Sequence, residues 1–305
     1  MYNYLSEPTP ITEQKWPDGY APLVTTRTIT FMHEAFIRDC IEGILMQKTT
    51  FPVEVVIHDD ASTDKTAAIV REYEAKYPRL IKAIYQKENQ FSKPGKGTMR
   101  EDINKVIRGR YIALCEGDDY WTDPLKLQKQ VEFLERNEDY SMSSHEVEIV
   151  FEGVDVVENF YGEPIIDGNF EKIINAGLFI ALNSIVYRKE LLLDRPEWLS
   201  KLPGGHKALI YMLTGKGKNY HFMDKMAVKR RNPGGITYLQ AKWRKKNKIK
   251  YNIFLLENLK TYLNHEKDQV INKRLKQLYL NQAKKQTKSL RLWEVPYYLY
   301  KYLVA

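Results

Sequence analysis

The chain has 305 residues, of which 43% are hydrophobic and 28% are charged, with a mean hydropathy of −0.50. This composition excludes a collagen-like, a disordered or a coiled-coil protein, and the length suits one large α/β domain or two smaller ones. No apolar run approaches the roughly 18 residues of a membrane span, and the N-terminus lacks the basic start and apolar stretch of a secretory signal. We therefore expect a cytoplasmic protein.

The charged residues are unevenly distributed. Residues 241–305 hold 16 lysines and arginines against 4 acidic residues, a balance of +12, whereas residues 1–240 hold 31 against 35, a balance of −4. The net charge of +8 thus belongs to a mildly acidic body joined to a strongly basic C-terminal region. Such asymmetry points to an anionic partner for the basic region.

Only two cysteines are present, Cys40 and Cys115, and each lies within an apolar stretch. Two thiols alone cannot build a structural zinc site, which usually needs about four ligands. We expect both to be buried free thiols in a reducing cytosol rather than a disulfide.

Residues 1–22 contain four prolines and little periodicity, which predicts an arm or loose lead-in. From Leu23 to about Arg136, short β-rich runs alternate with segments of helical periodicity. The expected strands are 23–31, 53–57, 80–85 and 111–115, and the expected helices are 34–46, one from the 60–64 capping segment to 76, one ending at 108, and one from 123 to about 135.

This alternation predicts a parallel sheet covered by helices on both faces. In such sheets, ligands bind outside the carboxyl ends of the strands. Two acidic clusters follow strands at those ends, Asp59–Asp60 and Glu116–Asp119. We therefore expect segments distant in sequence to converge on one crevice.

From residue 140 to residue 231, the alternation of strand and helix patterns is less regular. The pattern predicts a hairpin of 147–151 and 154–157 around Gly153, strands over 184–187 and 220–229, and a short helix over 206–213. After Gly235 the chain is expected to be helical to about 288.

The segment Glu116-Gly117-Asp118-Asp119 places three carboxylates within four residues after an apolar strand. Such carboxylates repel one another unless a cation neutralises them, and oxygen ligands favour Mg²⁺ or Mn²⁺, which are often shared with a diphosphate. Gly117 allows close approach of the backbone to a ligand. A solvated acidic turn is the alternative interpretation.

Two further groups of residues are candidate ligand-binding sites, but each can also be explained by a purely structural role. Asp59 and Asp60 at a strand end can accept hydrogen bonds from a nucleobase or a sugar hydroxyl, but Asp60 could equally cap a helix. Arg100 follows a loop rich in glycine and lysine at the start of a helix, where an anion could bind, but it could also be a surface arginine.

Together these segments resemble glycosyltransferase family 2, the bacterial nucleotide-sugar-dependent enzymes of GT-A fold. The matching stretches are Thr30–Glu34, His58–Asp64 and Tyr111–Pro124, the last two being specific. The resemblance implies a GT-A-type, Rossmann-like, mainly parallel α/β sheet flanked by helices. We expect an N-terminal arm over 1–22, a glycosyltransferase domain over 23–237 with a nucleotide-binding half over 23–136 and an acceptor half over 137–237, and a basic helical region over 238–305.

The resemblance also implies roles for individual residues. Asp60 matches the carboxylate that contacts the donor's uracil, Thr30 lies in the segment that lines the nucleotide pocket, and Arg100 matches a basic residue near the base and diphosphate. Residues 116–118 match the DXD motif. Asp118 would bind Mn²⁺ or Mg²⁺ that bridges the diphosphate, Glu116 would face the ribose or a metal-bound water, Gly117 lies between them, and Asp119 would support the site and the metal.

In the family, an Asp or Glu at the start of a late helix usually acts as the general base of an inverting displacement. Here the corresponding position is His206. Imidazole, with an ordinary pKa of about 6.5, could serve as that base. His206 could instead simply begin a helix, or mark a relative that binds donors without transferring sugar. Glu163 or Asp167 could also serve as the base.

Other departures from the family pattern are Asn232, where relatives often have His, and Ile29 and Met32, which replace Pro and Asn. After Gly235, a basic run over 242–250 precedes helically spaced apolar residues, and Trp, Tyr, Arg and Lys are interleaved over 290–302. This is the composition of an interfacial helix on anionic lipid, although a solvated basic face is an equal alternative.

The leading interpretation is a metal-dependent inverting glycosyltransferase that uses a nucleotide-sugar, expected to be a UDP-sugar, in bacterial surface polysaccharide synthesis. Its acceptor would be a glycan or a lipid-linked molecule, and its basic region would contact the inner face of the plasma membrane. No nucleic acid is expected as a partner because no recognition motif accompanies the charge. A donor-binding scaffold and a nucleotidyltransferase are the alternatives.

Overall fold

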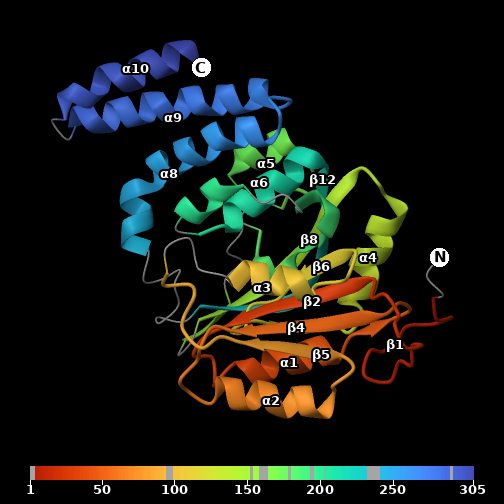
Figure 1. The fold of residues 1–305 in the computed structure, drawn as a ribbon. Coiled ribbons are helices and arrows are strands. Elements are labelled where there is room, and N and C mark those ends of the chain that lie inside the picture. The colour runs from red at the N-terminus through yellow and green to blue at the C-terminus, as the bar shows by residue number, and fades with distance from the viewer. Residues whose placement is uncertain are drawn as a thin grey trace.

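The computed structural model describes residues 4–93, 99–151, 154–157, 164–177, 180–192, 196–202, 204–231, 241–288 and 291–305. Within these residues, a ten-stranded mixed sheet lies between layers of helices, and a group of C-terminal helices extends from one side of it (Figure 1). The strand order is β10-β12-β8-β11-β6-β2-β4-β5, with β7 paired to β12 and β9 paired to β8.

The N-terminal half of the sheet is parallel, as the sequence predicts. Its strands are β2 (Val24–Thr30), β4 (Val53–Asp59), β5 (Ile81–Tyr85) and β6 (Tyr111–Leu114), and β2 lies between β4 and β6. Every residue of β4 is buried, because helices cover both faces of this part of the sheet. The intervening helices are α1 (Ile37–Leu45), α2 (Thr66–Lys76), α3 (Met99–Val106) and α4 (Lys126–Arg136).

The second half of the sheet is mixed. The strand β11 (Val186–Arg188) runs antiparallel to both β6 and β8 (Tyr140–Phe151), and β8 runs parallel to β12 (Lys218–Arg231). The predicted hairpin is confirmed, because β9 (Val154–Val157) pairs antiparallel with β8. The remaining elements are β7 (Tyr120–Trp121), β10 (Asp167–Gly168), α5 (Phe170–Ala176), α6 (His206–Lys216) and three 3₁₀ turns, 182–184, 189–192 and 197–201.

The N-terminal arm is docked on the body, so the prediction of a loose lead-in was wrong. The strand β1 (Thr9–Pro10) pairs with β3 (Lys48–Thr49), and Ile11 is buried. The amide of Gln14 donates to the carbonyl oxygens of Thr9 and Thr49 at 3.0 and 2.7 Å. These bonds satisfy backbone carbonyl groups of both β1 and β3 and hold the arm against the body.

The C-terminal region forms α8 (Ala241–Tyr262), α9 (Asp268–Lys288), the 3₁₀ turn 292–294 and α10 (Val295–Val304). The helices α9 and α10 lie side by side at the edge of the molecule farthest from α1 and α2 (Figure 1). Buried Leu255, Leu259 and Ile271 join the same core as α6, which anchors this region on the body. The helical extension expected from the sequence is therefore confirmed.

Candidate functional site

The carboxyl ends of β2, β4 and β6 converge, as the sequence predicts. The amide of Asp60 donates to the carbonyl of Thr30 at 3.0 Å, and the amide of Gly117 donates to the carbonyl of Ile29 at 3.0 Å. These two bonds place the segments after β4 and β6 on either side of the end of β2. The two acidic clusters of the sequence therefore share one edge of the sheet.

Gly117 is required by this close approach. A Cβ atom at position 117 would lie 2.6 Å from Thr30 Oγ1 and 2.8 Å from His33 Nδ1, closer than real Cβ atoms come to other heavy atoms. Thr30 and His33 themselves contact each other at 3.2 Å through Oγ1 and Nδ1. Any side chain at position 117 would push the acidic loop away from β2.

Glu116, Asp118 and Asp119 form the acidic loop that follows β6. One carboxylate oxygen from each lies within 4.8 Å of the others. The side chain of Glu116 is 45% exposed, whereas that of Asp119 is fully buried. Burial and the neighbouring Glu116 raise the pKa of Asp118 to about 6, as expected for like charges held close together.

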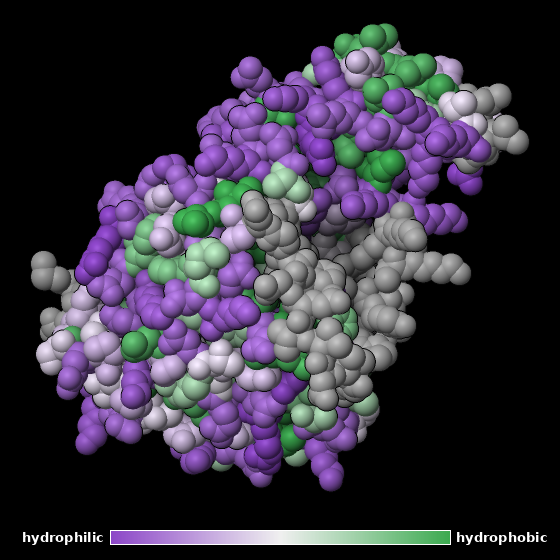
Figure 2. Space-filling view, turned by 180° about the vertical axis from the view of Figure 1, so that it is seen from behind, coloured by the Kyte–Doolittle hydropathy of each residue, from purple (hydrophilic) through white to green (hydrophobic). Residues whose placement is uncertain are grey.

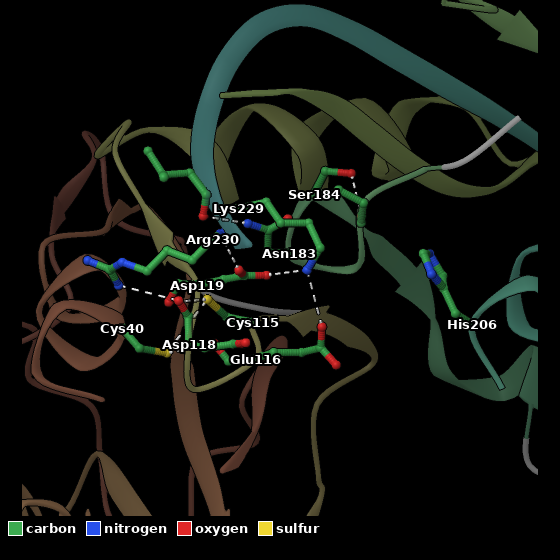
Figure 3. A network of polar contacts seen from close by, with 12 residues as sticks. Cys40, Cys115, Glu116, Asp118, Asp119, Asn183, Ser184, His206, Lys229 and Arg230 are labelled. Carbon is green, nitrogen blue, oxygen red and sulfur yellow. Dashed lines mark hydrogen bonds and ion pairs between the residues drawn. The ribbon is translucent and has the colours of Figure 1, made fainter. Parts of the chain in front are cut away.

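Two cationic residues of β12, which were not predicted from the sequence, contact the acidic loop. Lys229 Nζ lies 2.9 Å from Asp119 Oδ2 and 3.5 Å from Glu116 Oε2, so it bridges two of the three carboxylates (Figure 3). The backbone amide of Arg230 donates to Asp119 Oδ1 at 2.9 Å, and its guanidinium donates to the carbonyl of Asp118 and pairs with Asp39. Burial alone would lower the pKa of Lys229, but Asp119 and Glu116 outweigh it and hold the pKa above its ordinary value.

These contacts divide the acidic residues into two kinds. Both oxygens of Asp119 already accept hydrogen bonds from β12, so Asp119 ties β12 to the loop. Glu116 and Asp118 are partly exposed and offer oxygen ligands of the kind that Mg²⁺ and Mn²⁺ prefer. The loop therefore fits a divalent cation held by Glu116 and Asp118, with Asp119 as their support.

Asp60 directly follows the carboxyl end of β4 and is almost completely buried. Its two carboxylate oxygens accept the backbone amides of Gln90 and Phe91 at 2.7 and 2.9 Å. Its neighbour Asp59 accepts the amide of Ser62 at 3.1 Å. In this structure Asp60 positions the loop after β5, and its contact with a nucleobase stays a prediction.

The helix α3 is joined to β4 through side chains. Asp102 accepts from Gln86 at 2.9 Å, and the same Gln86 amide lies 3.1 Å from His58 Nε2. Arg100 belongs to the first turn of α3, but its side chain lies outside the described residues. Its predicted contact with a donor stays a prediction.

His206 begins α6, as expected from the sequence. Its Nε2 forms a hydrogen bond with the carbonyl of Ile180, so Nε2 carries the proton of the neutral ring and Nδ1 has the lone pair. Figure 3 shows the ring apart from the acidic loop, on the side where Glu116 lies. Burial would raise the pKa of Glu116, but the positive charge of Lys229 outweighs this effect and holds the pKa below its ordinary value.

The other candidate bases are placed differently. Asp167 belongs to β10, accepts from the hydroxyl of Tyr140 at 3.1 Å, and pairs in register with Tyr220. On the paired strand β8, the residues opposite Tyr220 and Lys229 are Ser143 and Ile149, which are six positions, or about 20 Å, apart at 3.3 Å per residue. Asp167 therefore lies well away from the acidic loop. Glu163 and Asn232 lie outside the described residues.

The two cysteines are free and buried, as predicted. Their sulfur atoms lie 3.7 Å apart, and Cys40 Sγ lies 3.5 Å from the carbonyl oxygen of Glu116. Burial raises the pKa of the Cys115 thiol. The two cysteines therefore pack beneath the acidic loop without a disulfide.

Comparison with known proteins places this site in a family context. A family model described as glycosyl transferase family 2 matches residues 28–183, which is half of the chain and includes the end of β2, β4, β6 and the acidic loop. An uncharacterized protein of Mycobacterium tuberculosis is 41% identical over 166 residues, 53% of this chain and 46% of the relative. TuaG of Bacillus subtilis, named as a teichuronic acid biosynthesis glycosyltransferase, is 34% identical over 116 residues, 38% of this chain and 43% of the relative. The matches thus span about half the length of these relatives.

Solved structures share the fold at low identity. Residues 1–349 of Staphylococcus aureus TarS in complex with UDP align with a TM-score of 0.58 and 19% identity, covering 84% of this chain and 71% of that one. The mannosyltransferase PcManGT from Pyrobaculum calidifontis, in complex with GDP-Man and Mn²⁺, aligns with a TM-score of 0.53 and 16% identity, covering 96% and 90%. Both similarities extend beyond the residues that the family model matches.

Proposed function

The chain belongs to glycosyl transferase family 2 and has its GT-A fold, and from this membership we propose that it transfers a sugar from a nucleotide-sugar to a hydroxyl acceptor with inversion. The observation that carries the proposal is the acidic loop. Glu116 and Asp118 stand at the carboxyl end of β6, beside the ends of β2 and β4, where α/β sheets bind ligands. The family match gives no support to the nucleotidyltransferase alternative.

The donor's diphosphate would lie over this loop. Glu116 and Asp118 would hold Mn²⁺ or Mg²⁺, which acts as a Lewis acid toward the departing nucleoside diphosphate when bound. The segments around Thr30 and Asp60 would line the nucleotide pocket, with Arg100 near the base and diphosphate. UDP is the proposed nucleotide, since TarS is similar in fold and its structure is named as a complex with UDP.

His206 would act on the acceptor. The lone pair on Nδ1 would accept the proton of the acceptor hydroxyl while its oxygen forms a bond to the anomeric carbon and the bond from that carbon to the diphosphate breaks. The ring is fixed by its hydrogen bond to the carbonyl of Ile180 and lies on the side of Glu116 (Figure 3). This placement supports the proposal that His206 faces the sugar end of the donor.

The acceptor would be a growing surface glycan or a lipid-linked precursor. The relative TuaG is named for teichuronic acid biosynthesis, which supports a role in surface polysaccharide synthesis. Within the described parts of the chain, no helix combines the length and apolarity needed to cross a membrane.

The C-terminal region supports a peripheral contact with anionic lipid. Trp293, in the 3₁₀ turn that precedes α10, is 75% exposed. Tyr297, Tyr300 and Val304 of α10 are also exposed and have the spacing of one helix face. Apolar side chains are visible over the C-terminal helices in Figure 2, bordered by hydrophilic ones. Aromatic side chains combined with an excess of Lys and Arg suit the interface of an anionic membrane.

A donor-binding scaffold is the second candidate, and the replacement of the family's acidic base by His206 is the observation that favours it. Incubation with a panel of UDP- and GDP-sugars, Mn²⁺ or Mg²⁺, and lipid-linked or oligosaccharide acceptors separates the two. Release of nucleoside diphosphate from one donor supports the enzyme. Donor binding without any release supports the scaffold, and a lack of binding to every donor contradicts both.

A further inference from the structure

Lys229 is a buried cation inside a cluster of acids. It is 8% exposed, although lysines are almost never buried unless they are paired. Its Nζ has Asp119 at 2.9 Å and Glu116 at 3.5 Å as partners, and it comes from a strand 110 residues further along the chain (Figure 3). The ammonium group therefore occupies the space among the carboxylates that a cation would favour.

The other nearby cation does not take this place. The guanidinium of Arg230 donates to the carbonyl of Asp118 at 3.3 Å, pairs with Asp39, and lies 4.5 Å from the ring centre of Tyr120. These contacts direct it toward α1 and β7 rather than between the carboxylates. Lys229 is therefore the cation that neutralises the charge of Asp119 and part of the charge of Glu116.

We propose that the ammonium of Lys229 is a resident cation of the acidic loop, which holds Asp119 and weakens the binding of a divalent ion at Glu116 and Asp118. The proposal rests on the metal role of the loop in the proposed function. Since the charge of Lys229 repels an incoming cation, it sets the concentration of Mn²⁺ or Mg²⁺ at which the loop is filled. It also keeps β12 joined to the loop when no divalent ion is bound.

The test is a calorimetric titration of Mn²⁺ into the full chain without any donor. Lys229→Gln, which can still donate to Asp119, should bind Mn²⁺ at least about 10-fold more tightly than the wild type, because one repelling charge is removed. Lys229→Arg keeps the charge and should stay close to the wild type. Lys225→Gln removes a charge from an exposed position of the same strand, and is the matched control that should change nothing.

Stability provides a second readout. Removal of the ammonium leaves the buried Asp119 without a charged partner, so Lys229→Gln should melt at a lower temperature than the wild type. Mn²⁺ should raise the melting temperature of Lys229→Gln by more than it raises that of the wild type. Equal or weaker Mn²⁺ affinity in Lys229→Gln overturns the proposal. So does a variant that stays unfolded in excess Mn²⁺, or a set of proteins none of which binds Mn²⁺. Because no donor is present, a failure of the proposed transfer reaction would not change these outcomes.

Discussion

The acidic loop and the C-terminal helices depart from the usual distribution of side chains in opposite ways. In the loop, charged groups such as Asp119 and Lys229 are buried, whereas in the C-terminal region large apolar groups such as Trp293 and Leu303 are 75% and 74% exposed. Buried charge and clustered exposed apolar surface both cost free energy, and both are typical of functional sites. We therefore propose that the loop carries the chemistry and that the C-terminal helices contact a partner.

The two regions also differ in how they are held. The loop depends on contacts between β2, β6 and β12 that are far apart in sequence, so a single substitution should disturb it strongly. The exposed face of α10 makes few contacts with the body, so its side chains should be removable without effect on the loop. We therefore expect substitutions in the acidic loop to abolish sugar transfer without changing lipid binding, and substitutions on α10 to do the reverse.

The largest effect is expected for Asp118→Asn. The substitution keeps the size of the side chain but removes the charge of a proposed metal ligand, and a Lewis-acid contribution of several kcal/mol corresponds to about 10³-fold in turnover. Steady-state release of nucleoside diphosphate measures this effect. Binding to lipid vesicles should be unchanged, and full turnover in the variant would remove Asp118 from the mechanism.

His206→Ala should reduce turnover by about 10²-fold or more, the usual contribution of a general base. Donor affinity should stay near that of the wild type, because the proposed role of the ring is toward the acceptor and not the nucleotide. Turnover of the wild type should rise with pH as His206 loses its proton, and His206→Asp should retain activity with a flatter profile near neutrality. A pH–rate profile of the three proteins checks this, and an unchanged profile in the alanine variant would assign the base to another group.

Gly117→Ala should lower the free energy of unfolding by about 1–3 kcal/mol, because the new Cβ overlaps Thr30 and His33. Gly177→Ala is the matched control. No atom lies within 4 Å of its Cβ position, and only its φ of +61° is unfavourable, so about 1 kcal/mol is expected there. Denaturant unfolding measures both, and a smaller loss at position 117 than at 177 would contradict the tight packing of the loop.

The smallest effect is expected for Trp293→Ala combined with Tyr297→Ala. Binding to vesicles that contain anionic lipid should weaken by about 3- to 10-fold, because two interfacial aromatic groups are lost. Met223→Ala, an exposed apolar residue on β12, is the control. Co-sedimentation with anionic and with zwitterionic vesicles measures the change. If the wild type binds neither kind and instead dimerises through this face, the lipid contact is wrong.

The sequence predicted the first half of the fold well, because its strands and helices follow from local periodicity and Gly117 and Asp118 stand directly after a strand. Rules for parallel sheets were then enough to bring the two acidic clusters together. Lys229 and Arg230 were not predicted, because their contacts with the loop join residues about 110 positions apart and depend on the register of β12. A lysine after the apolar pair Ala227 and Val228 was the available signal.

The sequence also could not show whether Asp60 binds a ligand or only stabilises the fold. Its partners are the backbone amides of Gln90 and Phe91, and backbone amides occur at nearly every position of any sequence. The docking of the N-terminal arm was hidden in the same way, since β1 is only two residues long and has no periodicity. In both cases tertiary contacts, rather than local pattern, decide the structure.

The assignment of the acidic loop as the donor site is best tested by calorimetric titration of UDP and GDP sugars in the presence of Mn²⁺, with the wild type, Asp118→Asn and His206→Ala. We expect one donor to bind to the wild type and to His206→Ala with similar affinity, and Asp118→Asn to lose nearly all of this binding. Equal donor binding by the wild type and Asp118→Asn would contradict the assignment of the acidic loop as the donor site.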